Sequence, residues 1–178
     1  MFRRPFQYPL AFLTALLTLA GLLVGSFFYQ EQVKAAPLER DLATVPGVHS
    51  VHVERAGGQW LVRVELGGVE LIPVTYRQLR ELADRRLGSG QYALRLVDRR
   101  TPELQQAFYE MSYYLEEARA RGNFAEAARR IEEKGRELGL ERARLYVDPE
   151  YLYLELVDDG GALYHVQQLR PPGEVSAE

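Results

Sequence analysis

The sequence predicts an α+β fold with an N-terminal transmembrane helix, an αββαβ unit and an ααβββ unit. Three observations lead to this prediction. Residues 5–30 carry no charged side chain. Residues 38–98 then alternate between apolar patterns typical of helices and of strands, in the order helix, strand, strand, helix, strand. Residues 100–170 read as two helices and three strands, so we expect antiparallel strands with helices packed on the sheet.

These patterns divide the 178 residues into six segments. About 140 residues follow the membrane segment, enough for one ordinary domain or two small units that share a core. The expected segments are a short cytoplasmic tail (1–8), a transmembrane helix (9–29), a linker (30–37), the αββαβ subdomain (38–99), the ααβββ subdomain (100–170) and a disordered tail (171–178).

The apolar stretch runs from Pro9 to Tyr29. A helix of that length covers about 30 Å, which matches the hydrocarbon core of a bilayer. Arg3 and Arg4 precede it, and the positive-inside rule therefore favours a cytoplasmic N-terminus and an extracytoplasmic module at the cell membrane. A cleaved signal peptide that ends near Ala35 is the competing interpretation, and it exports the module as well.

Small residues recur along one face of this helix at spacings of three and four. Gly21 and Gly25 form a GxxxG pattern, which lets two helix backbones approach closely. The alternative is that small residues are simply common in membrane helices. The possible dimer face consists of Ala11, Thr14, Thr18, Gly21 and Gly25.

The module is expected to begin with a short helix that buries Leu38, Leu42 and Val45 and stops at Pro46-Gly47. Two strands with alternating apolar residues follow, Val48 to Arg55 and Gln59 to Leu66. Gly57-Gly58 separates them and is typical of a two-residue hairpin turn. This register pairs Val53 with Val62 and Val51 with Val64, and it leaves the opposite face largely polar.

A second helix is expected from Tyr76 to Leu87 with Thr75 as its N-cap, followed by a strand from Tyr92 to Asp98. This element order, together with residues 45–51 (VPGVHSV), resembles the ring-building motif. Such domains occur in membrane-anchored proteins of secretion and sporulation channels. The resemblance covers residues 38–98 and implies a role in assembling oligomers.

Thr101-Pro102-Glu103 predicts the start of a helix that ends at Gly122, and Asn123 is expected to cap the next helix. Three strands follow: Ala143 to Val147, Tyr151 to Val157, and Ala162 to Leu169. Asp148 precedes a two-residue turn at Pro149-Glu150. The expected register sets Arg144 opposite Glu155 and gathers leucines on one face of the sheet.

The other face of this sheet carries tyrosines. Tyrosine supplies a large contact area at low entropic cost and is enriched at interfaces. The possible interaction surface is Tyr146, Tyr151, Tyr153 and Tyr164. The alternative is that a helix covers the face, with Tyr109, Tyr113 and Tyr114 as candidates to pack there.

Composition excludes several functions. The chain has no cysteine, which rules out disulfides and thiol chemistry, and its net charge of −3 comes without a basic block, so nucleic acid is not an expected partner. His49 and His52 fall on opposite faces of a strand, and Asp158 begins a hairpin turn. The sequence thus predicts no catalytic residue, no metal site and no cofactor.

Function is expected to follow from location. The predicted partners are the lipid bilayer, through residues 9–29, and a protein partner or a second copy of the chain. We therefore expect a membrane-anchored extracytoplasmic scaffold or assembly module that acts through protein contacts and is not an enzyme. A membrane-tethered ligand-binding or sensor domain with a pocket between its halves is the alternative, and an enzyme with an unrecognised site is a third.

Overall fold

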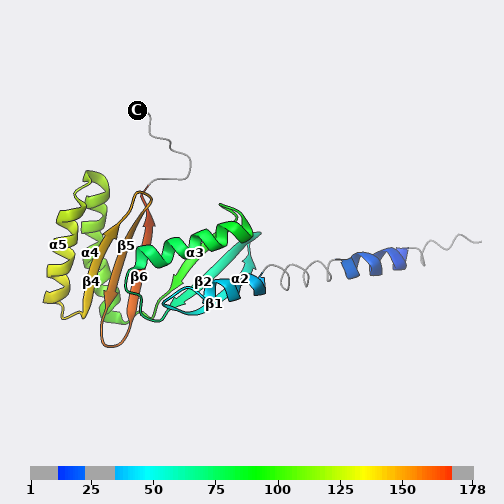
Figure 1. The fold of residues 1–178 in the computed structure, drawn as a ribbon, viewed down its shortest axis with the longest axis horizontal. Helices are drawn as coiled ribbons and strands as arrows, with labels where there is room; N and C mark the ends of the chain where they lie inside the picture. The colour runs from blue at the N-terminus through cyan, green and yellow to red at the C-terminus, as the bar shows by residue number, and fades with distance from the viewer. Residues whose placement is uncertain (1–11, 23–34, 170–178) are drawn as a thin grey trace, which may run out of the picture.

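The computed structural model describes residues 12–22 and 35–169 and has an α+β architecture with two three-stranded sheets (Figure 1). The first half of the module contains the sheet β1-β2-β3, and the second half contains the sheet β4-β5-β6. Within the described residues no continuous ladder joins these two sheets, so the two halves do not share one sheet.

The first half follows the predicted αββαβ order. Its elements are α2 (Ala36–Ala43), β1 (Val48–Ala56), β2 (Gln59–Leu66), α3 (Ile72–Leu87) and β3 (Tyr92–Val97). β1 and β2 pair antiparallel, with Val53 opposite Val62 and Val51 opposite Val64, which confirms the predicted register. Gly57 and Gly58 form the turn with φ of 59° and 82°, the positive values that a tight hairpin turn requires.

β3 lies on the other side of β2 and pairs with it in parallel, with Val62 opposite Leu94. This departs from the expected antiparallel arrangement. The physical reason is the connection: α3 crosses over the sheet between β2 and β3, and a helical crossover returns the chain to the end where the previous strand began. α2 and α3 cover one face of the sheet, where Leu38, Leu42 and Leu79 are fully buried against β1 and β2.

The second half contains α4 (Pro102–Arg121), α5 (Phe124–Glu137), β4 (Arg142–Val147), β5 (Tyr151–Val157) and β6 (Ala162–Gln168). Its strands are antiparallel, as predicted, and Arg144 lies opposite Glu155. The ion pair, however, is made by the diagonal neighbour Arg142, whose Nη1 lies 2.8 Å from Glu155 Oε1. α4 and α5 cover the leucine face of the sheet, where Leu152, Leu154 and Leu156 are fully buried.

Several predicted helix ends need correction. α3 begins four residues early, at Ile72, because Pro73 fits the first turn of a helix, where its missing N–H has no partner to lose. Thr75 is therefore a buried helical residue and not an N-cap. Thr101 does cap α4, accepting a hydrogen bond from the Leu104 N–H, whereas Asn123 makes no such bond at α5. Leu138, the apolar residue at the C-terminal end of α5, is 41 % exposed.

A third apolar cluster joins the two halves. It contains Val69 and Ile72 from the start of α3 and its preceding loop, Tyr76 from α3, and Tyr153 and Tyr164 from the second sheet. At one edge of this junction, Arg99 and Ala162 form an isolated antiparallel bridge with N···O distances of 3.0 and 3.1 Å. The halves are thus held together by both packing and backbone hydrogen bonds.

At the N-terminal end, residues 12–22 are helical, and every one of them is exposed. No helix within residues 12–22 or 35–169 is long and apolar enough to cross a membrane. Only part of the predicted span can be assessed, because residues 9–11 and 23–29 are outside the described residues. Of the possible dimer face, Thr14, Thr18 and Gly21 fall in the helix, and Ala11 and Gly25 fall outside the described residues.

Candidate functional site

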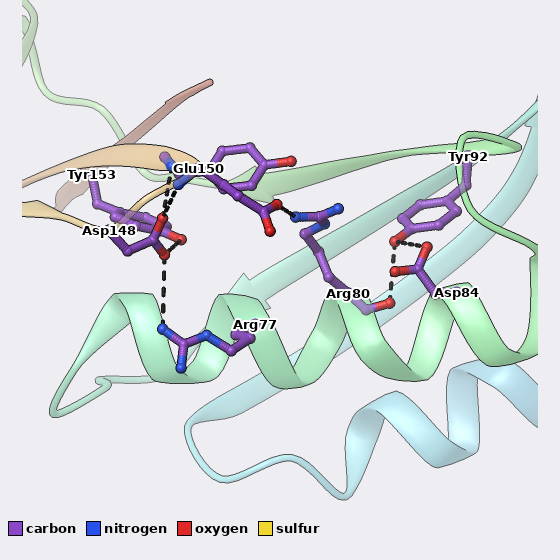
Figure 2. Close-up of polar contacts among 8 residues, drawn as sticks. Arg77, Arg80, Asp84, Tyr92, Asp148, Glu150 and Tyr153 are labelled. Atoms are coloured by element: carbon purple, nitrogen blue, oxygen red, sulfur yellow. Dashed lines mark hydrogen bonds and ion pairs between the residues drawn. The ribbon is translucent and has the colours of Figure 1, made fainter. Parts of the chain in front are cut away.

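A polar cleft of about 540 Å³ lies between the two halves of the module. One wall is the outward side of α3, and the other is the β4–β5 turn with the start of β5 (Figure 2). Its lining residues are Tyr76, Arg77, Arg80, Glu81, Asp84, Asp148, Pro149, Glu150, Tyr151 and Tyr153.

The α3 wall is built by helical spacing. Tyr76, Arg80 and Asp84 recur every four residues, so they lie one above another on the same side of the helix. Tyr76 is buried in the cluster between the halves, whereas Arg77 is 61 % exposed at the mouth. This wall of the cleft is therefore aromatic at its base, at Tyr76, and charged at its mouth, at Arg77.

Asp148 organises the opposite wall. Its Oδ1 accepts hydrogen bonds from the backbone N–H groups of Glu150 (2.8 Å) and Tyr151 (2.7 Å), as an aspartate does at the start of a turn. Its Oδ2 accepts from the Tyr153 hydroxyl at 2.7 Å and lies 3.9 Å from Arg77 Nη2 (Figure 2). Burial alone would raise the pKa of Asp148, but the hydrogen bond from Tyr153 and those from the turn lower it overall.

Arg80 connects the two walls. Its Nη1 lies 2.6 Å from Glu150 Oε2, and its Cζ lies 4.9 Å from the centre of the Tyr151 ring. Burial opposes the charged guanidinium, but the hydrogen bond with Glu150 and the neighbouring Tyr151 raise the pKa of Arg80 overall. The guanidinium thus makes an ion pair and a cation–π contact with the same turn.

Asp84 and Tyr92 close the far end of the α3 wall. The Tyr92 hydroxyl lies 3.0 Å from Asp84 Oδ1 and 3.1 Å from the Arg80 carbonyl oxygen, so two acceptors share its single proton (Figure 2). Burial, reinforced by the contact with Asp84, raises the pKa of Tyr92 to about 12. This contact fixes α3 to β3 and so holds Arg80 and Asp84 in place.

Three tyrosines form the base of the cleft. The Tyr76 ring meets those of Tyr151 and Tyr153 edge to face, with centroids 5.4 and 5.7 Å apart. Burial raises the pKa of Tyr76 and of Tyr153 well above the ordinary value, so both hydroxyls are protonated at neutral pH. They can donate or accept hydrogen bonds but carry no charge.

The cleft has a defined electrostatic character. Four carboxylates and two guanidiniums line it, which makes it net negative beside aromatic faces. Such surroundings attract a small cation, because both carboxylates and ring faces interact favourably with positive charge. No group of three or more histidine, aspartate or glutamate side chains in the described ranges could hold a metal ion.

The predicted tyrosine surface lies largely inside the molecule. Tyr153 and Tyr164 are buried at 1 % and 9 % exposure, and Tyr146 and Tyr151 pack around them, all in the cluster between the halves. The helix that covers this face is α3, with Tyr76. Tyr109 and Tyr113 of α4 are instead 61 % and 64 % exposed, with rings 6.0 Å apart.

The sequence predicts the turn that follows Asp148 but not its place in a cleft. Arg77, Arg80 and Asp84 fall within the helix expected from Tyr76 to Leu87, and the sequence pattern assigns them no site. The available signal was the charged side of α3 at a spacing of four residues. That spacing does not indicate which surface the charges will face.

Comparison with known proteins gives no family for this chain. None of the family models matches it, and no curated protein is found to be similar. The apolar helix, the cleft and the uncovered sheet face are therefore the observations from which a function can be argued.

Proposed function

We propose that this chain is a membrane-anchored scaffold or assembly module, held on the extracytoplasmic side, that works through protein–protein contacts. The observation that carries the proposal is the helix at residues 12–22. Its apolar side chains are largely exposed with respect to the described part of the chain: Phe12, Leu17 and Leu22 are 72, 64 and 67 % exposed. Exposed apolar surface costs about 25 cal/mol per Å² in water, and a bilayer removes that cost.

The surrounding sequence supports insertion. The charge-free stretch continues on both sides of the helix, from residue 5 to residue 30, and includes the 21 residues of the proposed span 9–29. Arg3 and Arg4 stand immediately before it. A short basic tail on one side favours retention of that side in the cytoplasm, which places the module outside.

Alkaline carbonate extraction and protease protection in intact cells test the anchor. We expect the full chain to resist extraction and its module to be digested from outside. A Leu16→Arg, Leu19→Arg double variant should become extractable, because each charge is costly at bilayer depth. Leu71→Arg is the matched control, since Leu71 is an exposed leucine of the module, at 47 %. Recovery of intact, folded chain from the aqueous fraction would refute the anchor.

The uncovered face of the first sheet supports a role in assembly. α2 and α3 pack on one face, and the other presents polar side chains to solvent. Ser50 donates a hydrogen bond to Glu65 at 2.8 Å, and Arg63 forms an ion pair with Glu54. Arg95 stands exposed among them without an ion-pair partner in the described part of the chain. The αββαβ order of this half also fits the resemblance to the ring-building motif.

Chemical cross-linking on membranes tests assembly through this face. We expect cross-linked oligomers or complexes in the unmodified protein and a marked loss of them in Arg95→Glu, which reverses a charge on the face. Arg136→Glu on α5 is the matched control, because Arg136 is also exposed and unpaired in the described ranges. A monomeric chain with no cross-linked partner would contradict the proposal.

The membrane helix offers a second contact for assembly. Thr14, Thr18 and Gly21 share one face, and the Thr18 hydroxyl is bonded to the Thr14 carbonyl at 2.8 Å. A side chain at Gly21 would meet no atom within 4 Å, so the face is open to a second helix. Gly21→Ile and Gly25→Ile should weaken self-association in a membrane two-hybrid assay, and an unchanged signal would remove this contact.

The cleft favours a second candidate function, a membrane-tethered sensor that binds a small organic cation. Glu81 lines the cleft and makes no ion pair within the described residues, which leaves a carboxylate for a ligand. Calorimetric titration with putrescine tests this function. We expect binding that Glu81→Gln weakens severalfold and that Glu133→Gln, a matched change on α5, leaves intact. Absence of heat with the unmodified protein would remove this candidate for that class of ligand.

A further inference from the structure

One end of the first half gathers the elements that lie closest to the proposed anchor. α2 and β1 run in opposite directions, so the start of α2 lies toward the β1–β2 turn. Within their contact, Glu39 Oε1 accepts a hydrogen bond from the N–H of Val53 in β1 at 2.7 Å. The Trp60 N–H donates a hydrogen bond to the Gln91 carbonyl oxygen at 3.2 Å, so the loop after α3 lies at the same end. Figure 1 shows that α2, the first element of the module, begins at this end.

The exposed charged side chains of the α2 segment, the hairpin turn and the last turn of α3 are basic. Arg40 on α2, Arg55 beside the hairpin turn, and Arg85 and Arg86 in the last turn of α3 are all exposed. Arg40 and Arg85 have no ion-pair partner within the described ranges. The guanidinium groups of Arg40 and Arg85 are therefore accessible to an external anion.

The acidic groups at the same end are engaged within the protein. Glu39 accepts the Val53 N–H, Asp84 accepts the Tyr92 hydroxyl, and Asp41 Oδ2 lies 2.6 Å from Arg86 Nη2. Their charges are thus partly satisfied internally, whereas Arg40 and Arg85 remain to interact with an external anion.

Chain length keeps this end near the bilayer. The apolar stretch ends at Tyr29, and the folded module begins at Ala35, which is buried at 4 % exposure. Six residues span at most about 20 Å even when fully extended. The headgroup layer occupies part of that distance, and electrostatic attraction reaches about 8–10 Å beyond it at physiological ionic strength.

The surface at this end also allows close approach. The hairpin turn is Gly57-Gly58, and the loop after α3 contains Gly88 and Gly90, so these two turns carry few bulky side chains. At Gly57, Gly58 and Gly90 an added Cβ would meet no atom within 4 Å. Long arginine side chains can extend past these turns toward phosphate groups.

From these observations we propose that this end of the first half is a membrane-docking surface for anionic phospholipid headgroups, with Arg40 and Arg85 as its main contacts. The proposal rests on the anchor proposed above. Docking would hold the first half against the bilayer and fix which way the open sheet face points. It would thereby restrict neighbouring copies to arrangements within the plane of the membrane.

The test uses the full chain in vesicles. Because the chain contains no cysteine, Ser89→Cys introduces a single site for a fluorophore at this end. Headgroup-labelled nitroxide lipid then reports the proximity of the fluorophore to the bilayer. In phosphatidylcholine vesicles containing about one-third phosphatidylglycerol, we expect severalfold more quenching at Ser89→Cys than at Ser112→Cys on α4.

Matched variants distinguish attraction of these arginines to the bilayer from the proximity that the short linker alone imposes. Arg40→Gln with Arg85→Gln should abolish most of the quenching, as should high salt or vesicles of phosphatidylcholine alone. Arg99→Gln with Arg136→Gln removes the same charge elsewhere and should leave the quenching unchanged. Equal quenching in neutral and anionic vesicles, or in both double variants, would overturn the docking surface. Extraction of the chain by alkaline carbonate would instead overturn the anchor and the docking surface together.

Discussion

Gly161 passes so close to Arg99 that a Cβ on it would lie 1.9 Å from the Arg99 carbonyl oxygen. The neighbouring residue, Ala162, exchanges both backbone hydrogen bonds with Arg99. Glycine is required here because the backbones of the two halves meet at this point. The obstacle is a backbone atom, which cannot turn aside as a flexible side chain can.

We therefore expect Gly161→Ala to destabilise the protein by at least about 1–3 kcal/mol, the usual cost of overpacking a tight site. The free energy of unfolding, measured with urea, is the readout. Gly139→Ala provides a comparison with a different cause, because Gly139 has a φ of 71° and an added Cβ there would meet nothing within 4 Å, whereas the φ of Gly161 is not positive. An unchanged free energy of unfolding in Gly161→Ala would contradict the role of the close approach.

Local patterns predicted most of the strands and their register. Val53 faces Val62, and Gly57-Gly58 turns the hairpin, because alternation and turn residues act within a few residues of each other. Thr101-Pro102-Glu103 likewise gave the correct start of α4. These features depend on local conformation and need no knowledge of the rest of the fold.

Other elements depend on contacts that the local pattern does not contain. The sequence around Thr75 is typical of an N-cap. In the structure, however, Ile72 is buried in the cluster between the halves, and α3 begins there, about one turn earlier. Tyr153 and Tyr164 were candidates for an external surface because nothing in their own strands shows what covers them. Tyr76, far away in the sequence, does so.

The candidate site was half predictable for the same reason. Asp148 was identified from the turn it begins, which is a local property. Arg80 and Glu150 lie 70 residues apart, and only the packing of the two halves brings them together. A charged helix face does not by itself indicate its partner.

Thr101 ties α4 to the β5–β6 turn. Its Oγ1 accepts from the Leu104 N–H at 3.1 Å and donates to Asp158 Oδ2 at 2.5 Å. We expect Thr101→Ala to cost about 1–2 kcal/mol of the free energy of unfolding, since it removes an N-cap and a second hydrogen bond. Thr101→Ser keeps the hydroxyl and should recover most of the loss. If Ser were as damaging as Ala, the methyl group and not the hydroxyl would be responsible.

Asp148 makes the stability of the module depend on pH. Its pKa in the folded chain lies below the ordinary value of about 3.9, although burial alone would raise it, because the Tyr153 hydroxyl and the turn N–H groups favour the carboxylate. The stabilisation is fully present above the unfolded pKa and is lost as pH falls through the lower, folded pKa.

The free energy of unfolding of the unmodified protein should therefore fall more steeply below about pH 4 than that of Asp148→Asn. Urea unfolding at a series of pH values measures both slopes. Asp159→Asn removes an exposed carboxylate for which the structure shows no contact, and it should preserve the slope of the unmodified protein. Identical slopes for the Asp148→Asn variant and the unmodified protein would contradict the assigned role.

Arg80 and Glu150 form the only ion pair under 3 Å that crosses the cleft among the described residues, and its strength can be measured by a double-mutant cycle. Arg80→Met and Glu150→Gln each remove one charge and keep most of the side-chain volume. Glu150 is 63 % exposed, so solvent screens the pair, and we expect a coupling free energy of about 0.2–1 kcal/mol that shrinks at high salt. Arg119→Met with Glu116→Gln, an ion pair within α4, provides a reference that does not join the halves. Zero coupling would mean that apolar packing and the Arg99–Ala162 bridge hold the two halves together without this pair.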